Sequence, residues 1–133
     1  AARLTDVPGA SEVFKQGLVT YSNKAKRKLL DVKKTTLKDY GAVSEKTAKE
    51  MAKNGAFVTG SDVCISITGI AGPDGGSEEK PVGLVYMACS LNNKVTVKEY
   101  HFQGSREKIR EYSVVRALTL LRSCILESDG KES

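Results

Sequence analysis

The sequence contains no tryptophan, one histidine and only three cysteines. Cys64, Cys89 and Cys124 lie in separate apolar runs without CxxC spacing, which argues against a disulfide framework and against a zinc site. We expect them to be buried free thiols in a reducing compartment. His101 and the scattered acidic residues show no metal-ligand spacing, so the sequence predicts neither a metal nor a cofactor.

No stretch approaches the roughly 20 consecutive apolar residues that a membrane-spanning helix needs. The first residues, Ala1–Thr5, lack the basic end and apolar run of a signal peptide. Hydrophobic residues make up 40% of the chain and charged residues 28%, as in ordinary globular proteins. We therefore expect one cytoplasmic domain over residues 1–127 with no membrane association, followed by a disordered polar tail at 128–133.

The chain carries a net charge of +5, and much of the excess lies between residues 24 and 34. A basic cluster of this kind could meet nucleic acid or a small anion. It lacks the interleaved aromatic residues and the recognition motifs of nucleic-acid-binding proteins, which makes nucleic acid an unlikely partner. A solvated helix face explains these charges better.

Helix signals recur along the chain. Ser44 precedes apolar residues with i, i+3, i+4, i+7 spacing, which predicts a capped helix that buries one face. Shorter helices are expected at 23–31 and in a segment that ends at Gly41. A last helix is expected to start at Ser105, with an apolar stripe made of Val114, Ala117, Leu118, Leu121 and Ile125.

Strand signals lie between these helices, at 17–21, 63–67, 82–90 and 95–102. Val63–Ile67 is a mostly apolar run, typical of a strand covered on both faces in a parallel or mixed sheet. Asn92 and Asn93 mark a hairpin turn between the last two strands. Helices precede, separate and follow the strands, so the predicted fold class is α/β, a three-layer α/β/α sandwich with a mixed sheet.

The most unusual segment, residues 68–83, follows the strand at 63–67 and is rich in glycine and proline. Ligands of open α/β sheets bind outside the carboxyl ends of strands, where glycines let backbone N–H groups approach an oxygen atom. The segment matches neither GxGxxG nor the P-loop pattern, so it indicates a ligand-binding loop of unnamed specificity, with a surface connection as the alternative. The candidate binding residues are Thr68, Gly69, Ala71, Gly72, Gly75 and Gly76.

Ser11, Tyr21 and Lys26 form a second candidate group. A serine hydroxyl needs a base to become a nucleophile, and a lysine serves as that base only when its pKa falls well below its ordinary value. Lys26 shares the inward helix face with Leu29 and Leu30. On spacing alone, a packed tyrosine, a snorkelling lysine and a capping serine remain the alternative. The spacing of Tyr21 and Lys26 also differs from the Tyr-x-x-x-Lys of short-chain dehydrogenases.

Arg106 opens the last helix, directly after Ser105. Backbone N–H groups, the helix dipole and a guanidinium together suit a phosphate or a carboxylate. Ordinary capping beside a surface arginine is the alternative.

Four separated segments resemble, in order, the C-terminal domain of the CinA family: Leu4–Ser11, Val19–Asn23, Tyr40–Ser44 and Ile67–Gly83. The resemblance runs from residue 1 to about residue 125, and the last segment is especially specific. The family's domain normally begins further upstream, with a helix, a strand and a Glu-Ser-Cys-Thr-Gly-Gly turn that precede Ala1 in the pattern.

The resemblance implies an amidase that converts nicotinamide mononucleotide to nicotinate mononucleotide and ammonia. It implies a serine mechanism without metal or cofactor, in which Ser11 is the nucleophile and Lys26 and Tyr21 assist proton transfer. The glycine-rich loop and Arg106 would bind the nucleotide substrate, and the family leads us to expect a homo-oligomer, a dimer or larger. The alternative function is a catalytically inactive nucleotide-binding or regulatory domain of the same fold.

Overall fold

The computed structural model describes residues 32–60 and 62–132. The expected strand at 17–21 and the expected helix at 23–31 lie outside the described residues. In chain order the elements are α4 (Lys34–Tyr40), α5 (Glu45–Thr59), β1 (Val63–Gly69), β2 (Leu84–Leu91), β3 (Lys94–His101) and α6 (Arg106–Glu132).

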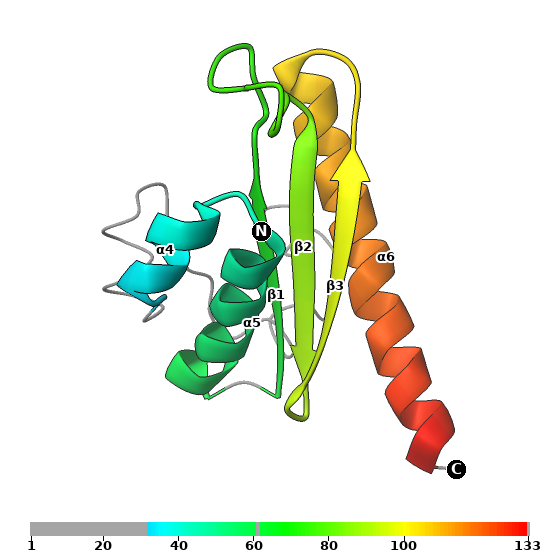
Figure 1. Cartoon of the computed structure of the whole chain (residues 1–133). Helices are drawn as coiled ribbons and strands as arrows, with labels where there is room; N and C mark the ends of the chain where they lie inside the picture. The colour runs from blue at the N-terminus through cyan, green and yellow to red at the C-terminus, as the bar shows by residue number, and fades with distance from the viewer. Residues whose placement is uncertain (1–31, 61, 133) are drawn as a thin grey trace.

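The described elements form three layers, with the sheet between α5 on one face and α6 on the other (Figure 1). This confirms the predicted α/β/α sandwich. The strand order is β1-β2-β3, and every pairing among the described strands is antiparallel. The predicted mixed sheet also includes the strand expected at 17–21, which lies outside the described residues. The loop 70–83 and a two-residue turn reverse the chain without a crossover helix, and a parallel pair would need such a crossover.

The turn between β2 and β3 confirms the predicted hairpin. Leu91 pairs with Lys94, so Asn92 and Asn93 form a two-residue connection. Their φ angles are 51° and 69°, which fits the left-handed turn whose twist matches a hairpin. Asparagine tolerates this backbone conformation better than other residues with a side chain, which explains the sequence signal.

Helix α5 begins after Ser44, as the sequence predicts. The Ser44 hydroxyl accepts a hydrogen bond from the Thr47 N–H at 3.2 Å, and Gly60 ends the helix in the left-handed conformation. Ala48 and Ala52 face the sheet and pack on Ala88 of β2. These small side chains allow α5 to approach the sheet closely.

Strand β2 is the strand that is covered on both faces. Its residues are buried from Leu84 to Ser90, apart from the half-buried Tyr86, which explains its long apolar run. The sequence assigns this environment to Val63–Ile67, but Ile67 of β1 is 41% exposed. Within the described part of the chain β1 pairs with β2 alone, so one of its edges is unpaired there.

Helix α6 starts after Ser105, as predicted, and its buried face matches the predicted stripe in part, since Ala117 and Leu121 pack against the core. Ile109, Ser113, Leu120 and Cys124 are buried, whereas Ile125 is 40% exposed. The Ser113 hydroxyl donates to the Ile109 carbonyl oxygen at 2.7 Å, so this polar side chain can be buried. A search for apolar residues at helical spacing does not detect a buried serine.

The same helix continues to Glu132, so residues 128–132 are helical instead of forming the predicted disordered tail. The prediction was based on their polar composition, but polar residues can extend a helix that is already packed, and no proline interrupts this one.

The core on the α6 face includes two of the cysteines. Cys89 and Cys124 are buried there with Val85, Met87, Ile109 and Leu120. Cys64 is partly buried, and its burial raises the pKa of the thiol. All three thiols are free.

Candidate functional site

The glycine-rich loop, defined here as residues 70–83, joins β1 to β2 at one end of the sheet (Figure 1). Its base is closed by two hydrogen bonds, from the Ile70 N–H to the Leu84 carbonyl at 2.9 Å and from the Gly83 N–H to the Ile70 carbonyl at 2.7 Å. The loop therefore continues the β1–β2 ladder at its base and opens only beyond Ile70.

Two glycines allow the arms of the loop to pack on each other. A Cβ atom at Gly72 would lie 2.6 Å from Cγ1 of Val82, and one at Gly76 would lie 2.7 Å from the Val82 N atom. Gly72 and Gly75 also have φ angles of 84° and 95°, which favour glycine. The glycine content therefore serves a compact loop conformation as well as access to a ligand.

The outer part of the loop surrounds an open depression of about 440 Å³. Gly75 and Gly76, both predicted binding residues, contribute to its lining. Asp74 and Glu78 place two carboxylates on the same lining. Two glycines thus line the depression, while its side-chain charge is negative.

Arg106 at the start of α6 reaches this loop. Its Nη1 donates a hydrogen bond to the Gly72 carbonyl oxygen at 3.0 Å. A guanidinium has five N–H donors, so this contact leaves other donors for a ligand. The structure thus brings together two features that the sequence analysis treated separately, Arg106 and the loop.

The other predicted binding residues lie below the depression. Thr68 is 7% exposed, and its hydroxyl donates to the Ala42 carbonyl oxygen at 2.7 Å. A Cβ atom at Gly69 would lie 2.8 Å from Cγ2 of Val85, and Ala71 is partly buried against the α6-side core. These three residues lie at the base of the loop, whereas Gly72, Gly75 and Gly76 lie further along it and Arg106 contacts it from α6.

The predicted catalytic residues Ser11, Tyr21 and Lys26 lie outside the described residues. Their arrangement relative to the glycine-rich loop therefore stays a prediction.

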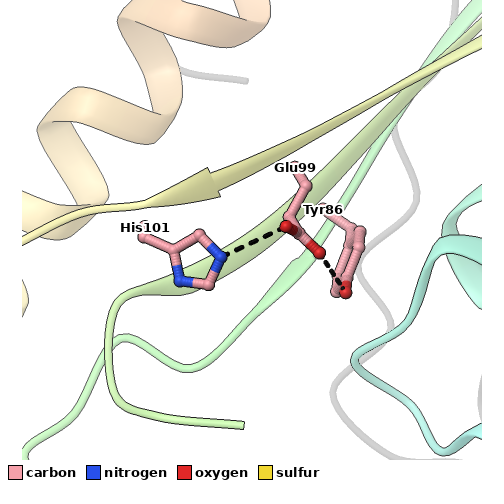
Figure 2. Close-up of polar contacts among 3 residues, drawn as sticks. All are labelled: Tyr86, Glu99 and His101. Atoms are coloured by element: carbon pink, nitrogen blue, oxygen red, sulfur yellow. Dashed lines mark hydrogen bonds and ion pairs between the residues drawn. The ribbon is translucent and has the colours of Figure 1, made fainter.

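A polar cluster that the sequence analysis missed lies on β2 and β3 (Figure 2). The Tyr86 hydroxyl donates to Glu99 Oε1 at 2.5 Å, and His101 Nε2 lies 3.2 Å from Glu99 Oε2. The hydrogen bond to Glu99 raises the pKa of Tyr86 to about 12 and lowers the pKa of the Glu99 carboxyl. Tyr86 and Glu99 are register partners, a relationship that the hairpin turn would have revealed from sequence.

Among residues 32–60 and 62–132, no helix is long and apolar enough to cross a membrane. Within the same described ranges, no group of three histidine, cysteine, aspartate or glutamate residues is placed to hold a metal ion.

An α/β/α domain with a glycine-rich loop anchored at the start of its last helix is the class that the fold and site define. The chain belongs to the CinA family: the model of the CinA C-terminal domain matches residues 1–125. It is 57% identical over 122 residues to a protein of Clostridium novyi (strain NT) that is named among the competence-damage inducible proteins. That match covers 92% of this chain but only 30% of the relative, so the chain spans about a third of the length of the curated relatives it matches.

Solved structures share the fold. The competence/damage inducible protein CihA from Agrobacterium tumefaciens superposes with a TM-score of 0.89 at 42% identity, over 92% of this chain and 75% of that one. The competence damage-inducible protein A from Klebsiella pneumoniae gives a TM-score of 0.90 at 32% identity, over 94% and 78% of the two chains.

Proposed function

We propose that the chain hydrolyses the carboxamide of nicotinamide mononucleotide to give nicotinate mononucleotide and ammonia. The proposal draws on the membership in the CinA family and on the residues at which the chain resembles it. The observation that carries it is the glycine-rich loop with Arg106 bonded to its Gly72 carbonyl, because this arrangement places a cation suited to a phosphate against the loop expected to bind the ligand.

In the proposed mechanism, Ser11 attacks the carbon of the carboxamide. Lys26, assisted by Tyr21, accepts the serine proton and returns a proton to the nitrogen that leaves as ammonia. Water then attacks the resulting acyl-enzyme ester, which releases the nicotinate product and restores the Ser11 hydroxyl. The steps use no metal and no cofactor.

The loop supplies electrostatic stabilisation in this proposal. N–H groups of Gly75 and Gly76 would donate to the oxyanion that forms when Ser11 attacks. Asp74 and Glu78 line the same depression, and their carboxylates would repel a phosphate placed beside them. We therefore assign the substrate phosphate to Arg106.

The same proposal places the protein in the cytoplasm as a homo-oligomer. Its partner is a small nucleotide substrate, and neither a membrane nor nucleic acid takes part.

Incubation with nicotinamide mononucleotide, followed by measurement of ammonia and nicotinate mononucleotide, tests the activity. We expect Ser11→Ala and Lys26→Ala each to lower kcat by at least about a thousandfold, in the range measured for nucleophile and base variants of serine hydrolases. Lys24→Ala serves as the matched control, because Lys24 lies on the opposite side of the predicted helix and should leave activity unchanged.

Turnover that survives in both Ser11→Ala and Lys26→Ala would exclude the mechanism. Calorimetric binding of the nucleotide to the wild-type chain without any turnover would instead support the inactive, nucleotide-binding alternative.

A further inference from the structure

Lys80 lies where the tip of the glycine-rich loop closes on itself. The Ser77 N–H donates to the Lys80 carbonyl oxygen at 2.9 Å, and the Lys80 N–H donates to the Ser77 hydroxyl oxygen at 3.1 Å. These two bonds make residues 77–80 a closed turn. The Lys80 side chain therefore extends from a turn that its own backbone helps to close.

The ammonium of Lys80 leaves the loop and contacts a distant segment. Its Nζ donates to the carbonyl oxygen of Tyr40, the last residue of α4. Gly41 follows with a φ of 82°, and a Cβ atom there would lie 2.8 Å from the Lys80 Nζ. The absence of a side chain at Gly41 leaves room for the ammonium.

The segment that receives this bond is itself fixed. The Gly41 carbonyl oxygen accepts hydrogen bonds from the hydroxyls of Ser44 and Thr47, at 3.0 Å and 2.6 Å. Lys80 thus bonds to a connection that is joined to the start of α5, and α5 packs on the sheet. The contact therefore joins the tip of the loop to a segment that is itself held in place.

On its other side the loop is held by α6. Arg106 bonds to the Gly72 carbonyl, and the packing of Gly72 and Gly76 on Val82 joins the two arms of the loop. The loop therefore has one tie to α6 and a second, through Lys80, to the α4–α5 connection. Without the Lys80 side chain, this second tie would be lost.

We propose that Lys80 is a positioning residue that holds the tip of the glycine-rich loop so that the N–H groups of Gly75 and Gly76 meet the developing oxyanion. The inference rests on the proposed function. Because these donors would interact with charge that forms only in the transition state, Lys80 affects kcat and leaves KM nearly unchanged.

The test compares Lys80→Met, Lys80→Arg and, as a matched control, Lys53→Met, which replaces an exposed lysine on α5. We expect Lys80→Met to lower kcat about tenfold or more with KM within about twofold, because small misplacements of catalytic groups lower rates by such factors. Lys80→Arg retains a donor to Tyr40 and should restore most of kcat. Lys53→Met should match the wild type.

Amide hydrogen exchange of residues 70–83 gives a readout that does not need turnover. We expect faster exchange in Lys80→Met than in the wild type, with Lys80→Arg and Lys53→Met close to the wild type. Equal exchange in all four proteins would overturn the inference, even if the wild type hydrolysed no nucleotide. In an active enzyme, an unchanged kcat in Lys80→Met, or a loss that Lys80→Arg fails to restore, would also overturn it.

Discussion

Arg106 at the start of α6 donates a hydrogen bond from Nη1 to the carbonyl oxygen of Gly72, across 3.0 Å. The two residues are separated by the rest of the loop and by the whole β2–β3 hairpin. The contact joins Arg106 to the glycine-rich loop, and we expect both to bind the substrate. The predictions below concern this contact, the residues that support the loop and the neighbouring polar cluster.

Arg106→Gln should weaken the binding of nicotinamide mononucleotide by about tenfold, which corresponds to about 1.4 kcal/mol. The substitution removes both the tie to Gly72 and the charge assigned to the phosphate. Arg110→Gln, one helical turn further along the exposed face, is the control and should bind as the wild type does. Isothermal calorimetry measures both; equal affinities for the Arg106 and Arg110 variants would remove Arg106 from the site.

Thr68→Val should lower the free energy of unfolding by about 1–3 kcal/mol, because it leaves the Ala42 carbonyl without its buried hydroxyl donor. The single O–H of Thr68 is already committed to that carbonyl, so we expect the nucleotide KM to change little. Urea unfolding and steady-state kinetics separate the two effects. A large rise in KM with unchanged stability would show that Thr68 contacts the substrate directly.

Gly83→Ala should destabilise the protein by more than about 3 kcal/mol, because a backbone conformation that favours glycine and a steric clash combine at this position. Its φ is 97°, and a Cβ atom there would lie 1.9 Å from the Phe102 carbonyl oxygen. Gly60→Ala is the matched control: its φ is 64° with no atom near the new Cβ, so only the left-handed backbone penalty of about 1 kcal/mol applies. Similar urea midpoints for the two variants would contradict the predicted clash.

Glu99→Gln should lower the pKa of Tyr86 from about 12 toward its ordinary value of 10.0, because the hydrogen bond to the carboxylate is the largest cause of the shift. The wild type and Glu99→Gln are each compared with the same protein carrying Tyr86→Phe in addition. The difference in tyrosinate absorbance within each pair isolates the Tyr86 phenol. A Tyr86 titration that does not move in Glu99→Gln would refute the contact.

The same pair has a defined pH dependence. The pKa of Tyr86 is raised in the folded state, so its stabilising contribution is present below pH 10 and is lost as the pH rises toward 12. The pKa of Glu99 is lowered, so its contribution is present above the ordinary carboxyl pKa and is lost as the pH falls. In stability profiles, Tyr86→Phe should therefore differ most from the wild type near neutral pH.

Local signals predicted the features that depend on a few adjacent residues. Ser44 caps α5 as predicted, because a capping oxygen acts within one helical turn. Asn92 and Asn93 formed the hairpin for the same reason. The buried face of α6 was predicted only in part: Ala117 and Leu121 pack against the core, but Ser113 was missed. Its hydroxyl is satisfied within the helix, which a count of apolar residues cannot register.

By itself the sequence determined the three-layer class, the hairpin, the position of the glycine-rich loop and, through four segments that resemble it, the family. Only the tertiary structure decided which strand is covered on both faces, that Thr68 bonds to Ala42, and that Arg106 and Lys80 tie the loop to two different helices. The physical reason is range. Propensities, caps and turns act between neighbours in the chain, whereas the contacts that shape this loop join residues that only the packing of the sheet brings together.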